Sequence, residues 1–144
     1  MIARAAAALA VAAGGCSQGP ALTADCGGSL AGVWRAPSGR WQALEGRGRI
    51  ELYPIDREPA AVLPPGVMSA PAAIDLTRGS AGLTGTLTRR FERGAQFCRV
   101  TTPIAAVACG GGALTLTVHP PAPPSDWTTC AAPTAPAEPL ILRR

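Results

Sequence analysis

The chain has 144 residues, enough for one domain and too few for two of ordinary size. Hydrophobic residues make up 47% of it, but aromatic residues only 4% and charged residues only 15%, values that exclude a coiled coil, an acidic tail protein and a large multi-step enzyme. The formal net charge is +4, and all 13 basic residues are arginines scattered without a clustered stripe, so nucleic-acid binding is not expected.

The first fifteen residues have the features of a secretory signal. Arg4 precedes an apolar stretch at residues 5–13, and small residues follow it. The stretch is about nine residues long, whereas a membrane-spanning helix needs about twenty. We therefore expect residues 1–15 to be cleaved on export rather than to anchor the chain.

The expected cleavage site, Ala-Gly-Gly-Cys at residues 13–16, resembles the lipobox of bacterial lipoproteins, although Ala13 stands where leucine is usual. The resemblance implies that Cys16 becomes the first residue of the mature protein and carries acyl chains, which hold a protein firmly at a membrane. Ser17 in the next position implies sorting to the outer membrane. The alternative is an ordinary signal cleavage that releases a soluble secreted or periplasmic protein.

The five cysteines are an odd number, which in an exported protein indicates one thiol with a separate role. With Cys16 assigned to the lipid, four remain for two disulfides in an oxidising compartment. Of the three pairings open to them, we favour Cys98–Cys109, across a short hairpin-like segment, with Cys26–Cys130, between the ends of the domain. A zinc site is the rival, but no Cys-x-x-Cys spacing occurs, so we predict neither a metal nor another cofactor.

Residues 16–29 are small and polar and predict a flexible tether in front of a single domain at residues 30–144. In this domain apolar residues recur at period two, the pattern of a half-buried strand, and no stretch keeps a helical period. The strands predicted in chain order are 30–35, 40–44, 48–53, 73–78, 83–91, 95–101, 104–109, 113–118 and 140–142.

Proline-rich residues at 54–71 and 119–139 predict two excursions over the surface. Short turns separate most of the other strands, so successive strands are expected to be antiparallel neighbours. The predicted fold is all-β: a small antiparallel barrel or sandwich of about eight strands, stapled by disulfides.

Gly32-Val33-Trp34 on the first strand, together with an arginine near the C-terminus, resembles the lipocalin-like (calycin) barrels. In that family Gly-x-Trp opens the first strand, and the tryptophan plugs the barrel floor against a C-terminal arginine. The resemblance implies that Trp34 is the plug and that Arg143 or Arg144 is its partner. It also implies a carrier of a small apolar molecule, whereas the alternative is a buried tryptophan in another β fold.

Trp34, Arg35, Trp41 and Tyr53 belong to the one stretch that combines aromatic residues with arginines. Tryptophan, tyrosine and arginine dominate the energetics of interfaces, so these four residues are a candidate binding surface for a ligand or a protein partner. The alternative is that the aromatic side chains pack inward as core.

No catalytic constellation is recognisable in the sequence. His119 is the only histidine; it is expected on the outer face beyond the strand 113–118, and no Gly-x-Ser-x-Gly motif accompanies it. The carboxylates between residues 45 and 75 have arginine neighbours and are better explained as solvated ion pairs than as a glycosidic acid and base. We therefore predict a non-catalytic lipoprotein of the cell envelope that binds a ligand or a protein partner, the alternatives being a lipocalin-like carrier and an exported hydrolase inhibitor.

Overall fold

The computed structural model describes residues 26–58 and 62–144. The predicted signal sequence, Cys16 and the first part of the predicted tether lie outside these residues. The strands are β1 (Gly32–Ala36), β2 (Gly39–Gly46), β3 (Arg49–Pro54), β4 (Val67–Ser69), β5 (Ala73–Gly79), β6 (Gly82–Arg93), β7 (Gln96–Gly110), β8 (Ala113–Val118) and β9 (Glu138–Arg143). Nowhere in the described ranges is there a helix long and apolar enough to cross a membrane.

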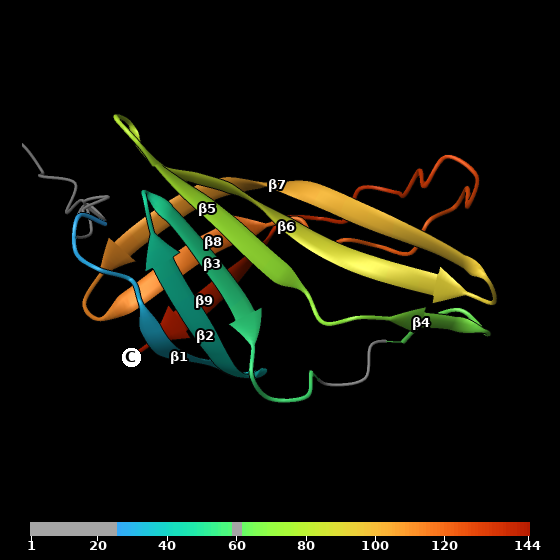
Figure 1. Cartoon of the computed structure of the whole chain (residues 1–144), viewed down its shortest axis with the longest axis horizontal. Helices are drawn as coiled ribbons and strands as arrows, with labels where there is room; N and C mark the ends of the chain where they lie inside the picture. The colour runs from blue at the N-terminus through green and yellow to red at the C-terminus, as the bar shows by residue number, and fades with distance from the viewer. Residues whose placement is uncertain (1–25, 59–61) are drawn as a thin grey trace, which may run out of the picture.

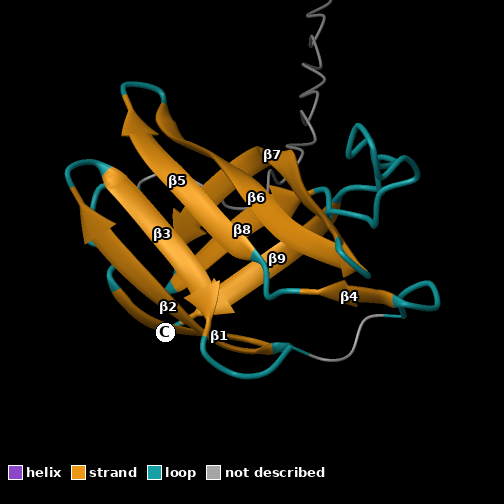
Figure 2. Cartoon of the chain, turned by 45° about the vertical axis from the view of Figure 1, so that its right-hand side comes forward, coloured by secondary structure: helices purple, strands orange, loops and turns teal. Residues whose placement is uncertain are grey.

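Eight strands form a closed antiparallel barrel, which confirms the predicted fold class (Figures 1 and 2). Each strand pairs with the next along the ring β1-β2-β3-β5-β6-β7-β8-β9, and the pair Arg35–Arg143 joins β9 back to β1. The ends of β6 and β7 that meet at their hairpin extend beyond the other strands, and β4 pairs with the last residues of β6 (Figure 1). We call this extension, residues 89–100 with β4, the arm.

Alternation along the strands fills the barrel interior. On β3, Ile50 and Leu52 have no exposed surface, while Glu51 and Tyr53 face solvent. The same alternation on the other strands produces a single hydrophobic core. Its buried members are Leu30, Trp34, Trp41, Ala43, Ile50, Leu52, Ala72, Ile74, Leu76, Leu87, Leu114, Leu116, Val118 and Leu142.

Trp34 is buried in this core and is covered by the last residue of the chain. Its ring is 3% exposed, and Nε1 donates a hydrogen bond to the Leu30 carbonyl oxygen at 2.8 Å. The Arg144 guanidinium lies over the ring, with Cζ 4.7 Å from the centroid, and also donates to the carbonyl oxygen of Ser29. Of the two arginines considered for this contact, Arg144 therefore makes it and Arg143 faces solvent.

β7 differs most from the predicted strands. Two strands, 95–101 and 104–109, were expected on either side of Pro103, but the structure has one strand of 15 residues. Proline ends a strand only where its missing N–H would have joined the ladder. Pro103 is the last residue of β7 that pairs with β6, and the pairing with β8 begins at Ile104 with an irregularity in register. The proline thus lies where β7 changes partner, and the strand continues through it.

The four remaining cysteines do form two disulfides, but the favoured pairing is wrong. The structure joins Cys26 to Cys109 and Cys98 to Cys130. Because Cys98 and Cys109 lie on the same extended strand, they are roughly 35 Å apart at a rise of about 3.3 Å per residue, far beyond the reach of a disulfide. The hairpin that was expected to bring them together does not exist.

The domain begins before the predicted boundary at Leu30. Cys26 is buried and disulfide-bonded, and Arg78 donates hydrogen bonds to the carbonyl oxygens of Cys26 and Gly28. Glu45 accepts a hydrogen bond from Arg78 and another from the Leu30 N–H at 2.7 Å, and these interactions, the Arg78 bond foremost, lower its pKa. The last four residues of the predicted tether are therefore part of the domain.

Asp56 fastens the start of the β3–β4 connection to the beginning of β2. Its carboxylate accepts hydrogen bonds from Arg40 Nη2 at 2.7 Å, from Arg40 Nε at 3.0 Å and from the Arg40 backbone N–H at 2.8 Å. The side-chain bonds from Arg40 are the largest cause that lowers the pKa of Asp56 to about 2.

We expect protonation of the Asp56 carboxylate to make the barrel less stable as the pH falls from about 4 to about 2. The folded pKa lies below the ordinary value of 3.8, so the stabilisation is complete above that value and is lost as the pH falls through the folded pKa. Thermal unfolding midpoints measured across this range should fall more steeply for the wild type than for Asp56→Asn. Equal slopes would show that Asp56 contributes no such stability.

Candidate functional site

A cavity of about 470 Å³ opens at one end of the barrel, where β8 ends and β9 begins. Its apolar walls include Trp41 from β2, Leu87 and Phe91 from β6, Val118 from β8 and Leu140 from β9. These are the inward-facing positions of their strands, so the cavity continues the hydrophobic core toward solvent. The cavity is therefore a property of the barrel itself and not of a surface loop alone.

β6 contributes the central part of the wall because of its alternation. Leu87, Arg89 and Phe91 are two residues apart and face the cavity, whereas Thr88 and Arg90 face outward. Leu87 and Phe91 are buried. Arg89 therefore lies on the cavity wall between two large apolar side chains.

Arg89 is paired there with Glu58 from the β3–β4 connection. Arg89 Nη2 lies 2.9 Å from Glu58 Oε2, and the two side chains are only 20% and 18% exposed. Glu58 also accepts a long hydrogen bond from the Ala72 N–H at 3.4 Å, and Arg89 donates a long one to Ser69 Oγ at 3.5 Å. The pair is neutral as a unit, but it keeps N–H donors and carboxylate lone pairs that a ligand hydroxyl or carbonyl could use.

The β8–β9 connection, residues 119–137, supplies another wall through Pro120, Pro121 and Pro123. Thr102 Oγ1 donates to the His119 carbonyl oxygen at 2.6 Å, which fixes the start of the connection to β7. His119 Nδ1 lies 2.8 Å from the Ala135 carbonyl oxygen, which ties the two ends of the connection to each other. The only histidine thus has a structural role at this place.

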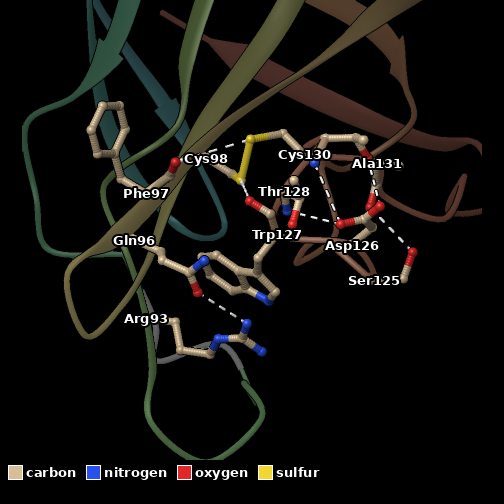
Figure 3. The surroundings of a disulfide bond; sticks show 11 residues. Arg93, Gln96, Phe97, Cys98, Ser125, Asp126, Trp127, Thr128, Cys130 and Ala131 are labelled. Carbon is tan, nitrogen blue, oxygen red and sulfur yellow. Dashed lines mark hydrogen bonds between the residues drawn. A yellow bond between two sulfur atoms is a disulfide. The ribbon is translucent and has the colours of Figure 1, made fainter.

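The middle of the connection is held against the arm by the disulfide Cys98–Cys130 (Figure 3). Beside it, the Trp127 ring faces Arg93, whose Cζ lies 4.6 Å from the centroid. Asp126 accepts a hydrogen bond from the Thr128 N–H at 2.8 Å, which shapes the turn that leads to Cys130. Figure 3 shows that the middle of the connection is fastened by one covalent bond and several polar contacts.

The structure does not bring the four residues of the candidate binding surface together. Trp34 and Trp41 are 3% and 5% exposed inside the barrel, whereas Arg35 and Tyr53 lie on the outer face. The reason is again alternation: Arg35 follows Trp34 directly on β1, so their side chains leave opposite faces of the sheet. Of the four, Trp41 alone lines the cavity.

Comparison with protein-family models, curated proteins and solved structures finds no match to this chain. The candidate site therefore rests on its geometry. In residues 26–58 and 62–144, no group of three or more histidine, cysteine, aspartate or glutamate side chains could hold a metal ion. What the cavity offers is a largely apolar volume whose polar lining consists of the Arg89–Glu58 pair, Ser38 and Glu138.

The sequence contained a partial signal for this site. Leu87, Arg89 and Phe91 alternate on a strand that was predicted, so one arginine between two apolar residues on an inward face could have been noticed. Glu58 and the prolines of the β8–β9 connection could not have been assigned, because only the folded barrel places them against β6.

Proposed function

We propose that this chain is a non-catalytic binding protein whose barrel cavity takes a small, largely apolar molecule that carries one polar group. The supporting observation is the cavity of about 470 Å³ with an apolar wall and the Arg89–Glu58 pair. Ligand sites commonly have volumes of about 300–1,000 Å³, with few polar groups that fix orientation. Because Arg89 and Glu58 already engage each other, we assign them to recognition of the polar group and not to a catalytic step.

We further propose that the protein belongs to the bacterial cell envelope and is held at the outer membrane by lipid on Cys16. The likeness of residues 13–16 to a lipobox supports this, and so do two disulfides, which are typical of an oxidising compartment. The intact mass of the exported protein, before and after reduction, reports cleavage, acyl chains and disulfides together. An unmodified N-terminal peptide would overturn the lipid assignment.

The cavity proposal is tested by filling the cavity from β9. Leu140→Trp adds bulk inside the cavity, whereas Ile141→Trp adds the same bulk at the next position, on the outer face. We expect Leu140→Trp to weaken binding of the neutral dye N-phenyl-1-naphthylamine by about tenfold or more, because the added ring occupies the space of the ligand. Dye fluorescence titration measures the effect, and thermal unfolding verifies that both variants are folded.

In this experiment Ile141→Trp is the matched control and should bind the dye as the wild type does. Equal weakening in the two variants would place the dye elsewhere on the molecule. A wild-type chain that shows no saturable binding of the dye or of any other small apolar molecule would contradict the proposal directly.

A second candidate function, inhibition of an exported hydrolase, is favoured by one observation on the arm. Met68 and Phe97 are 61% and 65% exposed, and both lie opposite Glu92, so they share one face. Arg90 lies over the Phe97 ring at 4.8 Å. Methionine, aromatic and arginine side chains are enriched at protein interfaces. Assays of the purified protein against envelope hydrolases test this function, and Phe97→Ala with Met68→Ala should abolish any inhibition.

A further inference from the structure

The strand register collects three arginines that are scattered in the sequence. Arg35 on β1 lies directly opposite Arg40 on β2 and directly opposite Arg143 on β9. All three side chains are exposed, and each adjoins a buried residue that points inward, so the three guanidinium groups share the outer face of the barrel. We call Arg40, Arg35 and Arg143 the arginine row.

The row carries more positive charge than its surroundings neutralise. Asp56 forms its ion pair with Arg40 at 2.7 Å, and Arg35 is close enough to contribute to the charge interactions of the same carboxylate. Arg143 forms no ion pair with any residue in the described part of the chain. Like charges directly opposite each other on neighbouring strands are destabilising, so this arrangement works against folding. A binding role explains an arrangement that the fold alone disfavours.

On the three strands that carry the row, no other outward position is charged; the nearest charges are Asp56 beside Arg40 and, on the next strand, Glu51 opposite Leu44. Along β9, β1 and β2, the remaining outward positions are Pro139, Ile141, Val33, Gln42 and Leu44. Ile141, Val33 and Leu44 are 37%, 46% and 49% exposed. The surface therefore combines a line of guanidinium groups with apolar side chains that are open to solvent.

We propose that the arginine row binds the phosphate groups of anionic lipid headgroups, with the neighbouring apolar side chains against the membrane interface. The guanidinium fork matches phosphate oxygens in two-point hydrogen bonds, and positive side chains are attracted to anionic leaflets. Guanidinium groups that bind phosphate and aliphatic side chains open to solvent lie on the same three strands, as a surface that lies against a lipid headgroup layer requires. An acidic protein surface is the alternative partner, and an absence of preference for anionic vesicles would favour it. The proposal depends on neither the cavity ligand nor the lipid on Cys16.

Vesicle binding tests this proposal. All chains carry Cys16→Ser, so that no acyl chain holds them, and they are mixed with vesicles of phosphatidylcholine alone or with about one third phosphatidylglycerol. We expect the parent chain to sediment with the anionic vesicles, and we expect Arg35→Gln/Arg143→Gln to weaken this binding by about tenfold or more at low salt. Residues 1–25 are common to all variants, so any contribution that they make to binding cancels in the comparison between variants.

The matched control is Arg47→Gln/Arg99→Gln, which removes the same charge from the β2–β3 turn and from the arm. Neither arginine forms an ion pair within the described ranges, and the control should weaken vesicle binding by less than about threefold. Equal losses in the two variants would show attraction by net charge alone and would overturn the proposal, as would an absence of preference for anionic vesicles.

Two further readouts separate binding from folding. Thermal unfolding of Arg35→Gln/Arg143→Gln should occur at or above the parent temperature, because like-charge contacts are relieved. A lower temperature would mean that the two arginines stabilise the barrel, and this too would overturn the proposal. Dye binding in the cavity should be unchanged, so failure of this proposal is distinguishable from failure of the proposed function.

Discussion

Replacing Gly85 by alanine is expected to lower the free energy of unfolding by about 3 kcal/mol or more, one of the largest single effects in the molecule. A Cβ built at Gly85 would lie 2.1 Å from the Asp75 carbonyl oxygen and 2.7 Å from Leu76 Cδ2. Gly85 is directly opposite Leu76 in the β5–β6 pair. Because the first contact is with backbone, no side-chain rotation can relieve it, and β5 must move away from β6.

Gly46→Ala is the matched control for this prediction. Gly46, the last residue of β2, is likewise a barrel-strand glycine, but a Cβ there would meet no heavy atom within 4 Å, and its φ is not positive. We expect it to change the free energy of unfolding by no more than about 0.5 kcal/mol. Urea denaturation of the two variants measures the difference. Similar midpoints for both would mean that β5 and β6 can separate at Gly85 without loss of stability.

Removal of the Cys98–Cys130 disulfide is expected to affect both stability and ligand binding. The bond closes a loop with a sequence separation of 32, for which chain entropy gives about 3.7 kcal/mol. It also holds the β8–β9 connection, whose Pro120, Pro121 and Pro123 line the cavity. Cys98→Ser/Cys130→Ser should therefore unfold at lower urea concentration and should bind the dye less tightly under conditions where it remains folded.

The other disulfide provides the comparison. Cys26–Cys109 has a sequence separation of 83, for which the same relation gives about 4.5 kcal/mol, and neither cysteine lines the cavity. Cys26→Ser/Cys109→Ser should therefore lose at least as much stability while folded molecules keep their affinity for the dye. Equal losses of affinity in both double variants would mean that the β8–β9 connection does not shape the site. Peptide mapping of the unreduced protein checks the pairing itself.

Several features of the fold were predictable because they depend on neighbours in the chain. Ile50 and Leu52, or Leu114 and Leu116, are separated by single polar residues, and this spacing places them on one face of any extended strand. Glycine-containing turns between such strands favour antiparallel pairing. These local patterns were sufficient for an all-β antiparallel barrel or sandwich, for most strand positions and for two disulfides among four cysteines.

The errors came from contacts between distant residues. Pro103 has the local character of a strand breaker, but its position between two partner strands makes the missing N–H harmless. The favoured disulfide Cys98–Cys109 required a turn between the two cysteines. Because β7 continues through this segment, the predicted pairing was wrong. The aromatic and arginine residues of the first strands were grouped by sequence proximity, although alternation sends Trp34 and Arg35 to opposite faces.

The candidate site, like the fold, was partly predictable from local spacing and partly dependent on contacts between distant segments. Leu87, Arg89 and Phe91 occupy one face of β6 through local spacing alone, but the ion pair with Glu58 depends on where the β3–β4 connection passes. Likewise, the proline-rich character of the β8–β9 connection was visible, whereas its place against the arm depends on Cys98–Cys130. An apolar strand face becomes a cavity wall only when no other segment of the chain fills the space in front of it.

What the sequence determined by itself is most of the strands, their inward and outward faces, and the even number of cysteines left for pairing; it did not reveal β4, which lies in the stretch predicted as a surface excursion, or the continuity of β7. The tertiary structure alone decided the closure of the barrel and its register, which set Arg143 beside Arg35 and Cys109 beside Cys26. The physical reason is that alternation acts between residues two positions apart, whereas register is fixed by the packing of the whole core and by the stagger that a closed sheet requires. Residues more than a hundred positions apart, such as Arg35 and Arg143, therefore become neighbours through the strand register, which no local segment of the sequence specifies.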